Sequence, residues 1–228
     1  MPNAATNPVS VVFGAITMMA MAIPAHAQMP PDFKVPELKK GDEQVMRDAR
    51  PFADCLVAHQ AKEIPKYLGS LIYKMEWLAR DMAKAHPECP APKKLGQDAT
   101  VYLQTALLEA LIKRDFSNVP PPANFENVPP LLYVKTSDND VSKEFFVNLI
   151  EPYDCVSRRE PAKVQAFLVT PPMSDAEAAA FNSLKATIVG CQPKGESWEL
   201  RAYFARRYLA ETYYTLMKVS QRQNASAH

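Results

Sequence analysis

Apolar side chains recur at three- and four-residue steps along most of the chain, a spacing typical of helices with one buried face. In the first half, this pattern predicts helices from Asp42 to about Leu56, over 62–68, from Leu71 to near His86 and over 101–112. No stretch alternates between apolar and polar residues for long enough to indicate a strand. We therefore predict an all-α fold.

The second half of the chain repeats the order of the first. Helices are predicted over 145–153 and 164–168, and a third begins at Ser174 because Ser174 and Glu177 have the spacing of a capping box. A long final helix follows residue 197 and ends at about Ser220.

Cysteines and glutamates occur at matching places in the two halves. Each half has an Asp-Cys pair at the end of its first predicted helix, a second cysteine just past its third and a glutamate on its apolar fourth helix. The spacing from the second cysteine to the glutamate is identical in both halves. The matching residues are Cys55, Cys89 and Glu109 in the first half and Cys155, Cys191 and Glu211 in the second. Self-similarity of this kind predicts two tandem, related helical units.

The four cysteines allow three disulfide pairings. A duplicated unit should carry its own bridge, so the repeat favours Cys55–Cys89 together with Cys155–Cys191. Closing loops of this size contributes about 3–4 kcal/mol each in the chain-entropy model, which matters for units with a small core.

Residues 1–27 indicate a secretory signal peptide. They contain no charged side chain, are largely apolar from Val9 to Met21 and end in Ala-His-Ala before Gln28. The segment lacks the usual Lys or Arg near its start, so its cleavage stays open. A membrane anchor is the less favoured alternative, because the apolar stretch is shorter than the ~20 residues of a span and Pro24 interrupts it. We expect a periplasmic or secreted protein with no membrane span after cleavage.

The remaining boundaries follow from proline and polar stretches. Pro120-Pro121-Pro122 and Pro129-Pro130 mark a break between the two units. The predicted organisation is a signal peptide over 1–27, an extended lead-in over 28–41, helical unit 1 over 42–116, a Pro-rich linker over 117–141, helical unit 2 over 142–220 and a disordered tail over 221–228.

Charge and local motifs exclude several functions. The 26 basic and 25 acidic residues are interspersed and give a net charge of +1, so no nucleic-acid partner is expected. The sequence shows no Cys-x-x-Cys pair, no glycine-rich phosphate loop and no His-Glu-x-x-His motif. His59 and His86 are isolated in the sequence. We therefore predict no catalytic residues, no metal site and no cofactor.

Glu109 and Glu211 are carboxylates of interest because they occupy matching positions on apolar helices. They could form a pair of buried carboxylates with raised pKa. The alternative is a charge that faces solvent or pairs with a basic residue one turn away, as Lys113 follows Glu109.

The last helix combines aromatic and basic side chains. Tyr203, Arg206, Arg207, Tyr213 and Tyr214 are candidate binding residues for an anionic or sugar-like ligand. The alternative is a packed aromatic seam covered by the arginine stems.

The fourth helix of each unit carries a family resemblance. Residues 103–112 read Leu-Gln-Thr-Ala-Leu-Leu-Glu-Ala-Leu-Ile, and residues 205–214 read Ala-Arg-Arg-Tyr-Leu-Ala-Glu-Thr-Tyr-Tyr. With the cysteines, they resemble the Leu-Arg-Gly-x-Leu-Ala-Glu-x-Leu-Tyr pattern of an uncharacterised family of exported bacterial all-helical proteins. Gln104 and Arg207 depart from the arginine and glycine of that pattern. The resemblance implies export and helical repeats, and no activity.

The sequence favours a non-catalytic binding or interaction module of the cell envelope, whose partner is an unknown protein or small molecule. One alternative is a small-ligand or lipid carrier that uses a cleft between the units. Another is an envelope hydrolase with a carboxylate pair.

Overall fold

The computed structural model describes most of the two predicted units. The described residues are 35, 37–60, 62–64, 80–92, 97–129, 140–193 and 199–226. The predicted signal peptide, most of the lead-in, and most of the expected second and third helices of the first unit lie outside these residues.

The described elements are helices, and the described residues contain no strand, so the prediction of an all-α fold is confirmed. Residues 80–85 form a further helical segment. The main helices are α1 (Asp42–Gln60), α4 (Gln97–Phe116), α5 (Asp140–Arg159), α6 (Pro161–Val169), α7 (Asp175–Cys191) and α8 (Ala202–Ser226).

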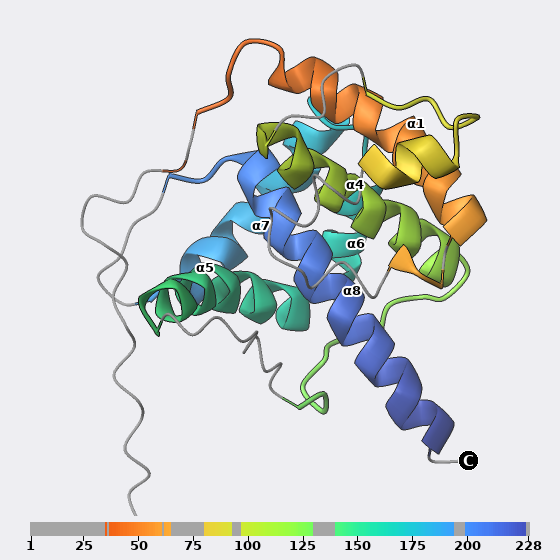
Figure 1. Cartoon of the computed structure of the whole chain (residues 1–228). Coiled ribbons are helices and arrows are strands. Elements are labelled where there is room, and N and C mark those ends of the chain that lie inside the picture. Colours follow the sequence, from red (N-terminus) through yellow and green to blue (C-terminus); the bar gives the residue numbers. More distant parts are fainter. Residues whose placement is uncertain are drawn as a thin grey trace, which may run out of the picture.

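Helices α4 and α8 form the centre of the molecule. Every residue from 103 to 112 on α4 is buried, because this segment is apolar nearly all the way round. Helix α1 packs on α4, α5 packs on α8, and α4 and α8 pack on each other. Figure 1 shows α8 running diagonally across the other helices. Buried side chains from both predicted units form one hydrophobic cluster, so the units share a core.

Both predicted disulfides are confirmed. Cys55 on α1 joins Cys89, which lies just beyond the helical segment 80–85. Cys155 on α5 joins Cys191, the last residue of α7. Each bridge therefore connects elements within one predicted unit. The relation of the two units by duplication stays a prediction.

The first part of the predicted linker is packed against the second unit. Phe125 and Val128 are buried, and the ring of Phe125 contacts that of Tyr213 edge-on. The guanidinium of Arg158 on α5 donates to the carbonyls of Phe125, Val128 and Pro129 at 3.0, 2.6 and 2.9 Å. Residues 117–129 are thus part of the folded body.

Helix α8 extends further than the sequence pattern predicted. It continues to Ser226, which corrects the expected disordered tail for residues 221–226. The segment contains no proline or glycine that would stop a helix, and residues 222–226 are exposed. None of the described helices is long and apolar enough to cross a membrane.

Candidate functional site

A charged cluster lies in the core where the two units meet. Because residues around Glu109 on α4 are buried on all sides, its carboxylate needs cationic partners. Arg50 of α1 provides one, with Nε and Nη2 at 3.0 and 2.9 Å from Oε2 of Glu109. Arg206 of α8 provides the other, with Nε 3.1 Å from Oε1. Glu109 therefore links three helices.

Arg206 is surrounded by protein on all sides and is only 2% exposed. Its Nε also lies 3.2 Å from Oε1 of Glu177 on α7. Its Nη2 donates to the carbonyls of Thr170 at 2.6 Å and Phe167 at 3.2 Å, and its guanidinium lies over the Phe167 ring. The guanidinium thus contacts two carboxylates and the end of α6.

Glu177 has a second role at the start of α7. The Ser174 hydroxyl accepts from the Glu177 backbone N–H at 3.1 Å, which confirms the capping position. The Glu177 carboxylate in turn accepts from the backbone N–H of Met173 at 2.6 Å, where the chain has a positive φ of 60°. Two carboxylates and two guanidiniums, those of Glu109, Glu177, Arg50 and Arg206, thus make a neutral set that we call the junction cluster.

Burial works against charge in the junction cluster. It raises the pKa of the Glu109 carboxyl above its ordinary value, and the Arg206 and Arg50 guanidiniums offset this only in part. Burial likewise lowers the pKa of Arg206, against the pull of Glu109 and Glu177. Burying these charges where the units meet is unfavourable. The ion pairs and hydrogen bonds of the junction cluster offset this cost.

Replacing Glu109 with glutamine should change how stability depends on pH. A pKa that is higher in the folded than in the unfolded state contributes stability that is full below the ordinary value of 4.5 and is lost as pH rises through the folded pKa. The free energy of unfolding of the wild type, minus that of Glu109→Gln, should therefore fall as pH rises above about 4.5. Urea unfolding at a series of pH values measures this difference.

Glu126→Gln is the matched control, because Glu126 is exposed. It removes a solvent-exposed carboxylate and is measured over the same pH range. If the free energy of unfolding of the wild type, minus that of Glu109→Gln, grows with pH instead, the two arginines lower the pKa of Glu109 by more than burial raises it.

The structure pairs Glu109 with a different carboxylate from the one considered in the sequence. Glu177 lies beside Glu109, and Arg206 stands between them. Glu211 is half-buried on α8 and contributes to the electrostatic environment of Tyr208. Both Glu109 oxygens contact guanidinium groups, so this carboxylate is poorly placed to accept a proton from a substrate.

The candidate binding residues of the last helix fall mostly in the interior. Arg206, Tyr213 and Tyr214 are buried. Tyr214 contacts Phe116, and burial raises its pKa to about 12. Tyr203 and Arg207 are half-buried, and the Arg207 guanidinium lies over the Tyr208 ring. This arrangement matches the packed aromatic seam that the sequence left as an alternative.

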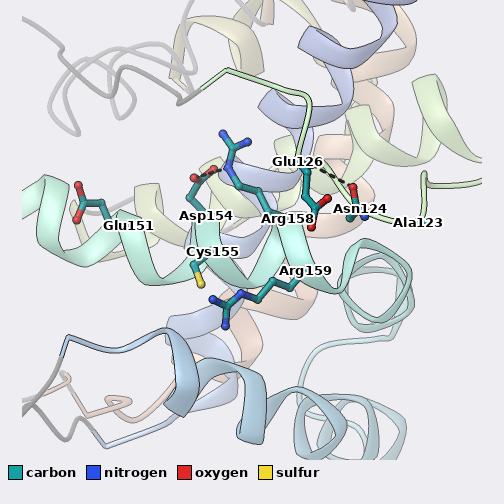
Figure 2. A pocket seen from close by; sticks show the side chains of 8 residues that line it. All are labelled: Ala123, Asn124, Glu126, Glu151, Asp154, Cys155, Arg158 and Arg159. Atoms are coloured by element: carbon teal, nitrogen blue, oxygen red, sulfur yellow. Dashed lines mark hydrogen bonds and ion pairs between the residues drawn. The ribbon is translucent and has the colours of Figure 1, made fainter. Parts of the chain in front are cut away.

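An open groove lies between α5 and the packed segment 123–126, and we call it the α5 groove. Its volume is about 490 Å³, within the range of ligand sites. Figure 2 shows the segment facing α5 across the groove, with Arg159 extending along the helix below Cys155. The lining residues are Ala123, Asn124, Glu126, Glu151, Asp154, Cys155, Arg158 and Arg159.

Two of these charged side chains hold the groove together. Asp154 accepts from Nε of Arg158 at 2.8 Å, and the other donors of Arg158 bind the carbonyls of the segment opposite. Cys155 also lines the groove, and its disulfide fixes α5 to α7. One wall of the groove is therefore tied to the other.

Two other charged side chains are available to a ligand. Within the described part of the chain, the Arg159 guanidinium and the Glu126 carboxylate form no hydrogen bond or ion pair, and both are exposed. The groove thus offers one cation and one anion on a fixed frame. It can recognise a ligand that carries both signs of charge.

A smaller pocket of about 270 Å³ lies beside the junction cluster. Ala106, Ala110, Ile112, Leu168 and Val169 form its apolar part. The charged side chains of Arg50, Asp54, Glu109 and Lys113 also line it. Residues of both predicted units contribute, so this junction pocket matches the location expected for a carrier cleft.

Several functional residues were missed in the sequence. Arg50 and Glu177 belong to a cluster that forms only when distant helices pack, and Arg158 and Arg159 line a groove between α5 and a segment distant in the sequence. The sequence signal for Glu177 was its capping box, which indicated a helix start and not a buried ion pair. His59 and His86 are isolated in the sequence but lie together in the structure.

Comparisons with known proteins do not add to this description. No family model matches the chain, and no curated protein or solved structure is significantly similar to it.

Proposed function

We propose that this chain is an exported, non-catalytic binding module of the cell envelope, and that its α5 groove binds a charged segment of a partner protein. The observation that supports this most directly is the pair of unpartnered charges, Arg159 and Glu126, in a groove of about 490 Å³. A segment with a carboxylate and a cationic group would complement both.

The frame of the groove favours binding without a large rearrangement. Arg158 holds the carbonyls of residues 125, 128 and 129, and the Cys155–Cys191 bridge fixes α5 to α7. A site that is already formed loses less conformational entropy when it binds a partner. Affinity can then come from a small number of charge-assisted hydrogen bonds.

Export is supported by the two disulfides. Such bridges form and persist in oxidising compartments, which include the periplasm and the extracellular space. We propose one of these two locations.

The small-ligand alternative is favoured by the junction pocket. Its apolar walls fit the interior of a carrier, but its volume of about 270 Å³ lies below the usual range for ligand sites of about 300–1,000 Å³. We therefore rank it second. The hydrolase alternative is the weakest, because Arg50 and Arg206 already occupy the Glu109 carboxylate.

Photo-crosslinking in intact cells tests the proposed groove. A photoreactive amino acid at Ala123 should give a discrete adduct with one partner protein. The same amino acid at Ala58, on the exposed side of α1 in the other unit, should not give it. Arg159→Glu in the Ala123 protein should lower the adduct yield several-fold, because it places a like charge against the partner's carboxylate.

Arg159→Lys is the matched control for that reversal and should retain most of the adduct, since the positive charge remains. The proposal fails if the adduct also forms at Ala58, or if Arg159→Glu leaves its yield unchanged.

A further inference from the structure

Two histidines and a glutamate converge at the Cys55–Cys89 disulfide, away from the α5 groove. His59 lies in the last turn of α1, one helical turn after Cys55. His86 and Glu88 lie in the turn that leads to Cys89. The bridge therefore fixes the two segments that carry these side chains at the same place.

The three side chains present their donor atoms to one point. Oε1 of Glu88 lies 2.9 Å from Nδ1 of His86 and 3.4 Å from Nε2 of His59. All three donor atoms lie within 4.8 Å of one another. In a tetrahedral site with bonds of about 2.0–2.1 Å, neighbouring ligand atoms are about 3.3 Å apart. Small side-chain rotations would therefore place all three around one ion.

The donor set has a definite metal preference. Two imidazoles and one carboxylate suit zinc and its neighbours among the divalent transition metals, whereas magnesium and calcium prefer oxygen ligands. Cys55 and Cys89 lie nearby, but their sulfurs are joined in the disulfide and supply no thiolate. Three protein ligands on an exposed surface leave the fourth position of a tetrahedral ion open to solvent or to a second molecule.

Neighbouring groups already orient the ligands. The Gln60 side-chain amide lies 2.8 Å from Nε2 of His86, the ring nitrogen that points away from Glu88. With a metal on Nδ1, Nε2 carries the proton and donates to the amide oxygen of Gln60, after a flip of that amide.

We propose that His59, His86 and Glu88 form a surface site for one divalent transition metal ion, with zinc as the ion that fits the donor set. Gln60 is a positioning residue that orients His86. The site is independent of the α5 groove, so the two proposals can fail separately.

Isothermal titration of the oxidised, tag-free chain with ZnCl₂ tests the site. His228 is replaced by glutamine throughout, so that the terminal histidine contributes nothing. One zinc ion should bind per chain, and MgCl₂ at the same concentration should not bind. Glu88→Gln and His59→Gln should each weaken zinc binding by at least about tenfold, and Gln60→Ala should weaken it by about tenfold.

Asp81→Asn is the matched control, because it removes an exposed carboxylate of the neighbouring helical segment and should leave zinc affinity unchanged. In the His228→Gln protein with its other residues intact, zinc should also shift the NMR signals of the His59 and His86 rings together, which tests the site without altering a ligand. Absence of saturable zinc binding would overturn the proposal. So would zinc binding that Glu88→Gln and His59→Gln both leave intact, or zinc binding without a shift of these two rings.

Discussion

Replacing Arg206 with methionine should lower the free energy of unfolding by about 3–5 kcal/mol. The change removes one cation from beside Glu109 and Glu177, at 3.1 and 3.2 Å, in a place where neither carboxylate can reach bulk water freely. It also removes the Arg206 hydrogen bonds to the Phe167 and Thr170 carbonyls, and Phe167 keeps those from the backbone N–H and the hydroxyl of Thr170. Urea unfolding followed by circular dichroism measures the loss.

Two further variants keep this prediction testable if Arg206→Met does not fold. The triple variant Arg206→Met, Glu109→Gln, Glu177→Gln removes the buried charges together and should be markedly more stable than Arg206→Met alone. Arg207→Met, one position along α8, should lower the free energy of unfolding by less than about 1 kcal/mol. Arg207 is only half-buried, and a methionine side chain can still pack over the Tyr208 ring. Equal losses at the two arginines would show that the junction cluster has no special role.

Removing either disulfide should lower the free energy of unfolding by about 3–4 kcal/mol. The bridges close sequence separations of 34 and 36 residues. Loop entropy depends only weakly on such a difference, so the two losses should be nearly equal. The double substitutions Cys55→Ala with Cys89→Ala, and Cys155→Ala with Cys191→Ala, provide the comparison by urea unfolding.

The two disulfide variants should differ in their local consequences. Loss of Cys55–Cys89 should weaken zinc binding, because this bridge fixes the segments that carry His59 and Glu88. Loss of Cys155–Cys191 should leave zinc binding unchanged and loosen the α5 groove. Stability losses that differ by more than about 2 kcal/mol would mean that packing in the folded state, and not loop entropy, dominates one bridge.

The sequence was sufficient for features that depend on local spacing. The helical periodicity, the capping box at Ser174 and the matched spacing of four cysteines all predicted what the structure contains. These signals are readable because helix geometry and a repeated cysteine pattern involve residues at fixed separations.

Features that depend on packing between distant helices were not predictable from the same patterns. Glu109 was recognised as unusual, but its partners Arg50 and Arg206 come from α1 and α8. His59 and His86 looked isolated because the contact between them forms across the first disulfide. Tyr213 and Tyr214 were ambiguous, since an aromatic stripe on a helix can be either a binding surface or core. Only the packing of α8 against α4 and α5 decides between these.

The position of the junction cluster has a consequence for how the two halves of the molecule unfold. Glu109 and Arg50 belong to the N-terminal half, whereas Arg206 and Glu177 belong to the C-terminal half. Separating the halves would break the Arg206–Glu109 ion pair and expose the apolar sides of α4 and α8 to water. Calorimetry should therefore show one cooperative unfolding transition. Neither half should fold when it is expressed without the other.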